Sequence, residues 1–165
     1  MKFSKQIKIN APAEKVWNIL GRDFENVGKW ATLVGHSEIN TEAAVVNGSH
    51  VGGRLCSTSI GKISEEFTEY DDQNMSFSFK GIITSKLFTK VISSNKVTAI
   101  DENTSKVTAT PQIDLTFLGT LMSPLIKLQL GKSVDEGLED LKYYVENGKP
   151  SPAKLSAIQK TANKS

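Results

Sequence analysis

Residues 121–148 read LMSPLIKLQLGKSVDEGLEDLKYYVENG, and this stretch decides the fold class. Its apolar residues recur at steps of three and four, which is the spacing of one face of an α-helix. They are Leu121, Leu125, Leu128, Val134, Leu138, Leu141 and Val145, with Gly131 in the gap of the stripe. Charged residues mostly occupy the other side, and Gly148 suits a helix end. We therefore predict one amphipathic helix of about six or seven turns.

The region before this helix has the pattern of β-strands. Alternating apolar and polar residues are broken by turn-forming groups such as NGS at 47–49 and DENTS at 101–105. The predicted strands are 33–40, 51–59, 62–70, 74–80, 86–99 and 105–117. Short connections favour an antiparallel meander. The group SSN at 93–95 is either a break or a bulge within one long strand.

The N-terminal region adds one strand and two short helices. Residues 2–9 alternate as a strand does, and NAPAEKVWNIL at 10–20 has helical spacing after a proline. Gly21 is a candidate end of that helix. Asp23 is a candidate cap of a second helix that runs about to Lys29.

The predicted fold class is therefore α+β. A curved antiparallel sheet of about seven strands wraps around one long C-terminal helix, with two short helices after the first strand. One helix cannot cover so wide a sheet, so we expect a cavity between sheet and helix. Residues 1–148 form the single predicted ligand-binding domain. Residues 149–165 contain four lysines and no acidic residue, and we expect a polar, basic tail that is frayed, or alternatively a binding arm.

Composition excludes several classes of protein. The net charge of +2 over 165 residues is too balanced to indicate a nucleic-acid partner. No apolar run has the length of a membrane span, so membrane insertion is not expected, and no secretory signal is recognisable. A cytoplasmic monomer or weak homodimer is the expectation. The single cysteine, Cys56, and two histidines without metal-ligand spacing predict neither a metal site nor a cofactor.

Five segments in register resemble a known family. They are APAEKVWNIL (11–20), DFENVGKW (23–30), GGRLC (52–56), GKISEEFTEYD (61–71) and DEGLEDLKYYVE (135–146). Residues 1–147 are similar to the START and birch-pollen-allergen superfamily, SRPBCC, which includes the polyketide cyclase/dehydrase and lipid transport proteins. The resemblance implies a helix-grip fold with a deep hydrophobic pocket. It does not imply one activity, because members carry lipids, sense hormones, or catalyse cyclisations and condensations.

Arg54 and Glu65 are the polar residues of greatest interest. The resemblance implies that the arginine of GGRLC points into the cavity. Glu65 alternates with Ile63 and Phe67 on the apolar face of its strand, where an acid needs a partner. We predict an Arg54–Glu65 pair on the concave face. Its role is either to hold two strands in register or to fix the polar end of a ligand.

The other candidate ligand contacts follow from strand and helix periodicity, and for Trp30 from the resemblance. Each of them is either a contact of the ligand or plain core. Glu65 is also the one weak candidate for a catalytic base. The predicted ligand-binding residues are Trp30, Arg54, Cys56, Glu65, Phe67, Phe77, Phe79, Leu125, Leu128 and Gly131.

Three functions remain open. The first is binding, transport or sensing of a small hydrophobic ligand in the cell, which needs an apolar cavity and one or two polar groups. The second is an enzyme of the cyclase or dehydratase type that acts on a polyketide-like or aromatic substrate, with Glu65 as the base. The third is a protein–protein module without a ligand, whose cavity would be small or filled.

Overall fold

The computed structural model describes residues 1–165 except 47, 60, 83–84 and 163–165. In this part of the chain, seven strands form one antiparallel sheet in the order β1-β7-β6-β5-β4-β3-β2. The strands are β1 (Lys5–Ile9), β2 (Val34–Ile39), β3 (Gly53–Thr58), β4 (Gly61–Asp71), β5 (Ser76–Ile82), β6 (Phe88–Asp101) and β7 (Thr104–Leu115). Their ends lie close to the predicted ones because the turn-forming groups mark them. Residues 93–95 lie inside one continuous strand, β6.

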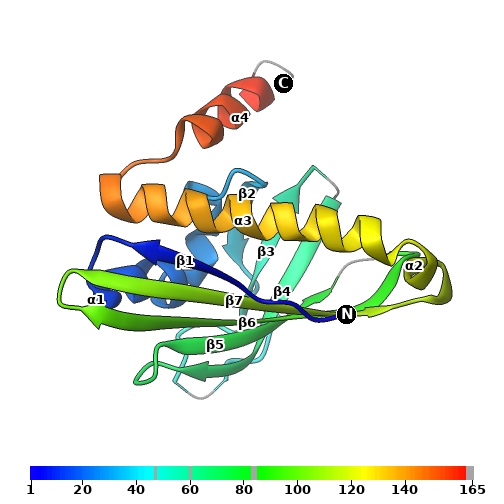
Figure 1. Ribbon diagram of the computed structural model, residues 1–165, viewed down its shortest axis with the longest axis horizontal. Helices are drawn as coiled ribbons and strands as arrows, with labels where there is room; N and C mark the ends of the chain where they lie inside the picture. Colours follow the sequence, from blue (N-terminus) through cyan, green and yellow to red (C-terminus); the bar gives the residue numbers. More distant parts are fainter. Residues whose placement is uncertain (47, 60, 83–84, 163–165) are drawn as a thin grey trace.

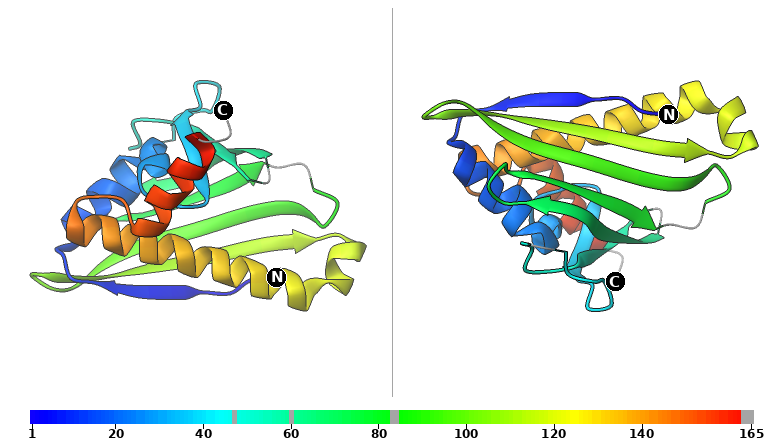
Figure 2. Two further views of the ribbon diagram at one scale, coloured as in Figure 1. Left: turned by 90° about the horizontal axis from the view of Figure 1, so that it is seen from above. Right: turned by 90° about the horizontal axis from the view of Figure 1, so that it is seen from below.

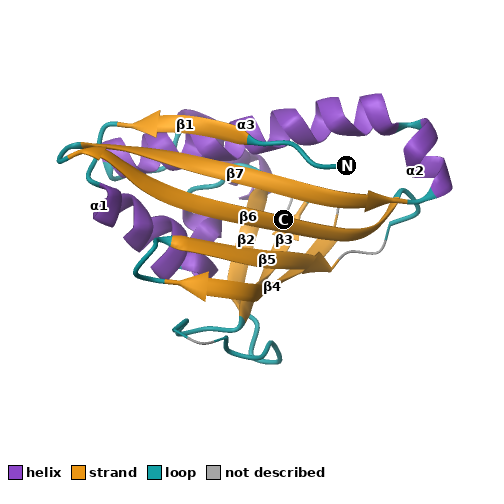
Figure 3. Cartoon of the chain, turned by 60° about the horizontal axis from the view of Figure 1, so that its bottom comes forward, coloured by secondary structure: helices purple, strands orange, loops and turns teal. Residues whose placement is uncertain are grey.

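The helices follow the predicted order, and two further helices lie at Phe117–Leu121 and Pro152–Ala162. In chain order, the helices are α1 (Ala13–Trp17), η1 (Asn18–Arg22), η2 (Phe24–Lys29), α2 (Phe117–Leu121), α3 (Ser123–Asn147) and α4 (Pro152–Ala162). Figures 1 and 3 show α1 and α3 on the same side of the sheet, which we call the inner face. The predicted helix-grip arrangement is confirmed.

Helix α3 packs on the β1–β7 side of the sheet rather than over its middle (Figure 2). Leu138, Leu141 and Val145 from its C-terminal half are buried in the core. Each such side chain contributes about 1.5–3 kcal/mol through the apolar surface that it removes from water. The helix ends at Gly148, whose φ of 67° is left-handed, so the predicted end is confirmed.

The prediction that one apolar stripe runs the length of α3 is wrong. The buried line runs back from Leu138 in four-residue steps to Ile126, which is 8% exposed. The predicted line instead stepped back from Val134 in three successive three-residue steps to Leu125. Each of those steps falls about 60° short of a full turn, so three of them reach the opposite side of the helix. The side chains there are exposed: Leu121 by 68%, Leu125 by 58% and Leu128 by 58%.

The two short N-terminal segments differ in detail from the prediction. Gly21 does not end the first helix, because the π-helical turn η1 continues to Arg22. A Cβ at Gly21 would lie 2.5 Å from the indole of Trp17, so glycine is needed for this packing. Asp23 precedes η2 but does not cap its backbone; its carboxylate accepts a hydrogen bond of 2.6 Å from the Asn26 side chain.

Asp72, in the turn between β4 and β5, connects the first helices to the sheet. Its Oδ1 accepts hydrogen bonds from Arg22 Nε at 2.8 Å and from Trp17 Nε1 at 2.7 Å. The bonds from Arg22 and then from Trp17 hold the pKa of Asp72 well below its usual range. This network fixes the inner-face helices relative to β4 and β5.

Residues 152–162 are not frayed as predicted, because they form helix α4, which lies beside β2 (Figure 2). The last three residues of the predicted tail, 163–165, lie outside the described residues. Lys154 is 1% exposed, and its Nζ donates to the Val34 backbone oxygen at 2.5 Å. Ser151 Oγ donates to Asp140 Oδ1 at 2.6 Å and accepts from Lys154 N at 3.1 Å. Asp140, which is 6% exposed, is therefore a buried connector between α3 and α4. The domain boundary at residue 148 stays a prediction.

Candidate functional site

The predicted Arg54–Glu65 pair is confirmed on the inner face of the sheet. The two residues lie directly opposite each other on β3 and β4. Arg54 Nε donates to Glu65 Oε2 at 2.5 Å, and only 10% and 18% of the two side chains are exposed. A charge-assisted hydrogen bond of this kind is stronger than one between neutral groups. It allows both charges to stay in a largely apolar place.

Helix η2 covers the guanidinium of Arg54. Arg54 Nη1 donates to the Phe24 backbone oxygen at 2.7 Å, and Arg54 Cζ lies 3.8 Å from the centre of the Phe24 ring. A cation over an aromatic face is attracted by the ring quadrupole. Through Phe24, the DFENVGKW segment is attached to the polar pair of the sheet.

An aromatic cluster surrounds this contact. Phe24 packs against Phe67 with ring centres 4.2 Å apart, and Phe77 lies 5.4 Å from both rings. Phe67 and Phe77 are buried, whereas Phe79 is half-buried. Trp30 is also buried in the core. Phe67, Phe77 and Trp30 are core in this structure, and ligand contacts by them and by Phe79 stay predictions.

Cys56 lies next to the pair but is not a nucleophile at neutral pH. Its Sγ donates to Glu65 Oε2 at 3.9 Å. Burial raises the pKa of the thiol to about 12, against the smaller opposing effect of the Arg54 charge. The thiolate, which is the reactive form, is therefore scarce at neutral pH.

Part of the inner face stays uncovered because α3 lies over β1 and β7. The uncovered residues are half-exposed and lie on neighbouring strands of the sheet. We call them the inner patch: Ile63, Glu65, Phe79, Gly81, Val91 and Ser93. These residues are only partly covered, which agrees with a sheet that is wider than one helix.

The polar pair has unused hydrogen-bonding atoms beside this patch. Within the described residues, Arg54 Nη2 donates to no acceptor and Glu65 Oε1 accepts from no donor. Neither atom belongs to the fully buried, unpaired polar atoms of the described chain. One donor and one acceptor are thus left for a molecule that lies on the inner patch.

Gly81 and Val91 are site residues that the sequence did not reveal. Glu65, Gly81 and Val91 lie opposite one another across three strands. A Cβ at Gly81 would meet the Val91 side chain at 3.6 Å, an ordinary contact, so glycine leaves a space beside Glu65 that a larger residue would fill. The signal available in the sequence was a glycine inside a strand, which often marks a place where another group can come close to the backbone.

Three predicted contacts from α3 lie elsewhere. Leu125 and Leu128 point to solvent, for the helical reason given above. Gly131 faces β1, where a Cβ would lie 3.8 Å from the Lys5 side chain. This is an ordinary contact, so the packing here does not require glycine, and a ligand contact by Gly131 stays a prediction.

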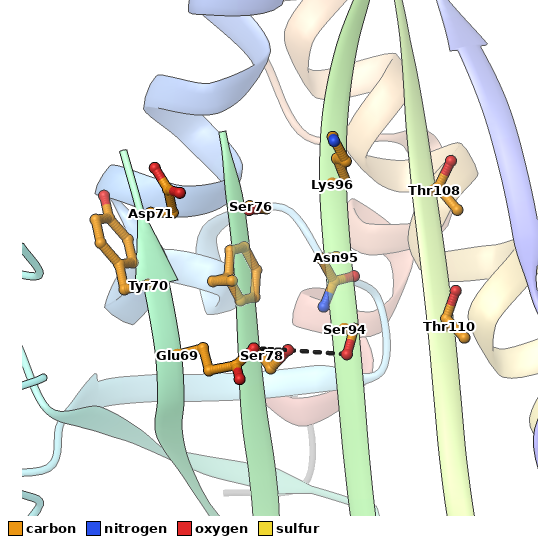
Figure 4. Close-up of a pocket in the computed structure, with 11 residues that line it drawn as sticks. Glu69, Tyr70, Asp71, Ser76, Ser78, Ser94, Asn95, Lys96, Thr108 and Thr110 are labelled. Carbon is orange, nitrogen blue, oxygen red and sulfur yellow. Dashed lines mark hydrogen bonds between the residues drawn. The ribbon is translucent and has the colours of Figure 1, made fainter. Parts of the chain in front are cut away.

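A groove of about 600 Å³ lies on the other face of the sheet (Figure 4). Figure 4 shows hydroxyl groups along it, and Ser78 Oγ and Ser94 Oγ lie 2.8 Å apart. Its charged lining residues are Glu69, Asp71 and Lys96. Tyr70 and Phe77 add apolar surface to this mixed lining.

A second groove, of about 660 Å³, lies between β2, β3 and α4 and has Leu33, Lys154 and Ile158 in its lining. Neither this groove nor that of Figure 4 is lined by Arg54 or Glu65. The inner patch is thus distinct from both. The cavity predicted between sheet and helix stays a prediction, and the inner patch marks where it would open.

The comparison with protein families decides the classification. The family model described as polyketide cyclase / dehydrase and lipid transport matches residues 1–146. This chain belongs to that family. The polyketide cyclase / dehydrase and lipid transport family was the one expected from the five segments, so the resemblance is confirmed. None of the curated proteins compared with the chain matches it significantly in sequence.

Solved structures of similar fold support the architecture. A START superfamily protein from Mycobacterium smegmatis has a TM-score of 0.71 at 16% identity, covering 88% of this chain and 97% of its own. The Zhui aromatase/cyclase from Streptomyces sp. R1128 has a TM-score of 0.73 at 10% identity, covering 88% and 93%. The protein XoxI from Bacillus cereus has a TM-score of 0.72 at 18% identity, covering 88% and 96%. At these identities the likeness shows the fold alone.

Proposed function

We propose that this protein binds a small hydrophobic molecule with one polar group on the inner patch, as a carrier or sensor. The polar group contacts Arg54 Nη2 and Glu65 Oε1. The observation that carries the proposal is the pair itself: it is largely buried, fixed by η2, and keeps one donor and one acceptor beside apolar side chains. Ligand sites commonly combine apolar walls with few oriented polar groups.

The half-exposed apolar side chains support the same proposal. Ile63, Phe79 and Val91 form the apolar surroundings of the free polar atoms. Burial of such surface by a ligand is favourable by about 25 cal/mol per Å² before the costs of binding are subtracted. The family description, which includes lipid transport, agrees with an apolar ligand.

A second candidate function is cyclisation of a polyketide-like or aromatic substrate. It is favoured by Glu65 Oε1, which has no donor among the described residues and is thus available to accept a proton from a substrate. The fold likeness to an aromatase/cyclase agrees with this candidate. The thiol of Cys56, protonated at neutral pH, is not the reacting group.

Native mass spectrometry of the protein isolated from the cell that makes it tests the proposal. The expected spectrum contains a complex with one small molecule, which identifies the ligand class. The affinity of that molecule for Arg54→Gln is then expected to fall in a variant that remains folded. An unchanged affinity would show that the pair is only structural. Chemical conversion of the molecule by wild type, but not by Glu65→Gln, would favour the enzyme.

A further inference from the structure

An exposed apolar ridge lies at one end of the molecule, outside the proposed ligand site. It is formed by α2 and the first half of α3, at the end where β7 finishes (Figure 1). We define the apolar ridge as Phe117, Leu118, Leu121, Met122, Leu125 and Leu128. Phe117 is the most exposed of these side chains, at 83%. Contiguous apolar surface of this kind usually marks a site of interaction.

The ridge is held in this orientation by contacts on its other side. Thr116 caps α2, since its Oγ1 accepts from Gly119 N at 3.1 Å, and Thr116 N donates to the Leu87 oxygen at 3.0 Å. A Cβ at Gly119 would lie 1.9 Å from that same oxygen, so α2 packs directly on the backbone of residue 87. Ile126, one position after exposed Leu125, is buried. The ridge therefore faces outward because the opposite side is already packed.

The charged residues within the ridge segment itself all have one sign. From Leu115 to Val134 the chain contains two lysines, Lys127 and Lys132, and no acidic residue. Lys86 lies beside α2, because its backbone oxygen accepts from Thr116 Oγ1 at 2.9 Å. Of the two acids that flank this segment in sequence, Asp135 is paired with Lys5 at 2.7 Å, and Asp114 lies in the same groove as Lys127. Among the described residues, three lysines against one unpaired acid leave the rim of the ridge basic on balance.

We propose that the apolar ridge docks on the surface of an anionic lipid bilayer. The ridge side chains enter the boundary between headgroups and acyl chains, and Lys86, Lys127 and Lys132 lie among the headgroups. An amphipathic helix with an apolar face and a lysine-bearing rim binds bilayers in this way. A second copy of the chain fits less well, because it brings lysines against lysines without an acidic residue in the segment to pair with them.

This docking does not depend on the ligand proposed for the inner patch. No helix among the described residues is long and apolar enough to cross a membrane.

Vesicle flotation tests the proposal. Purified wild type is mixed with vesicles of phosphatidylcholine alone or of phosphatidylcholine with phosphatidylserine. We expect it to float with the anionic vesicles, less at high salt, and poorly with the neutral ones. Lys127→Gln/Lys132→Gln should weaken binding about thirtyfold, from about 1 kcal/mol per lysine. Leu125→Glu/Leu128→Glu should abolish flotation, and circular dichroism should show both variants folded.

Ile100→Glu is the matched control. Ile100 is also an exposed apolar residue, but it lies near the β6–β7 hairpin at the other end of the molecule, so this variant should float like wild type (Figure 1). The proposal is overturned if wild type does not bind anionic vesicles, or if the leucine variant and the lysine variant both bind as wild type does. It is also overturned if wild type is a dimer that Leu125→Glu dissociates and neither form floats.

Discussion

Arg54 on β3 and Phe24 of η2 are joined twice: the Arg54 Cζ lies 3.8 Å from the Phe24 ring centre, and Arg54 Nη1 donates to the Phe24 backbone oxygen at 2.7 Å. The same guanidinium is bonded to Glu65. One side chain thus connects the short N-terminal helix, the sheet and the partly buried Glu65. Its loss has consequences for stability that are separate from any effect on a ligand.

Replacing Arg54 with alanine should lower the free energy of unfolding by about 2–3 kcal/mol. It leaves the carboxylate of Glu65 without its partner in a largely buried place, which is the costly half of breaking such a pair. Urea unfolding measures the change. Adding Glu65→Leu should recover most of it, because the unpaired charge is then removed.

The matched control is a neighbouring pair that joins β4 and β5. Lys80 Nζ lies 2.8 Å from Glu66 Oε2, and the two side chains are 46% and 23% exposed. Lys80→Ala should change stability by only about 0.5 kcal/mol, as is usual for exposed ion pairs. Equal losses for Arg54→Ala and Lys80→Ala would mean that the inner pair has no special role.

Two leucines of α3 provide a test of which side of the helix is buried. Leu141→Ala should cost about 3 kcal/mol, because Leu141 is buried in the core and its removal leaves a cavity. Leu125→Ala should cost less than about 0.5 kcal/mol, because its side chain is exposed. Thermal or urea unfolding of the two variants decides. A large loss for Leu125→Ala would place it in the core.

The thiol of Cys56 should react slowly in the folded protein. It is buried, and its pKa is raised to about 12, so little thiolate exists at about pH 8. We expect a disulfide reagent to label it much more slowly in buffer than in urea, where the thiol regains an ordinary pKa. Since Cys56 is the only cysteine of the chain, the signal is unambiguous. Equal rates would contradict the packing around β3 and β4.

Lys154 should make stability rise with pH in the alkaline range. Burial lowers the pKa of its ammonium from 10.5, so the unfolded chain binds this proton more tightly than the folded one. Stability therefore increases as pH rises through the lowered pKa towards 10.5. Urea unfolding at about pH 7 and about pH 10 should show a smaller rise for Lys154→Met than for wild type. Identical pH dependence would mean that Lys154 is not buried between α4 and β2.

The order of elements and the polar pair could be predicted because their signals are local. Turn-forming groups limit each strand, and Glu65 between Ile63 and Phe67 breaks a two-residue alternation in a way that requires a partner. The partner itself became identifiable once the arginine of the family motif was assigned to the neighbouring strand. The register of β3 and β4 then confirmed it.

The features that were missed depend on rotation or on distant contacts. The exposed side of α3 follows from whether steps of three or four are taken, which the sequence leaves open near Gly131. Helix α4 was missed because its lysines suggested solvent, although Ser151 followed by Pro152 is a typical helix start. The role of Gly81 depends on its neighbours across two strands, which sequence order does not reveal.

The measurement that tests the central claim most directly is native mass spectrometry of Gly81→Leu beside wild type, both isolated from the cell that makes the protein. The leucine side chain would occupy the space next to Glu65 and Val91. Gly35→Leu is the matched control, because Gly35 is an exposed strand glycine that lines the groove beside α4. We predict a small-molecule complex for wild type and Gly35→Leu and none for folded Gly81→Leu. A complex that persists in Gly81→Leu, or is lost in Gly35→Leu instead, would contradict binding on the inner patch.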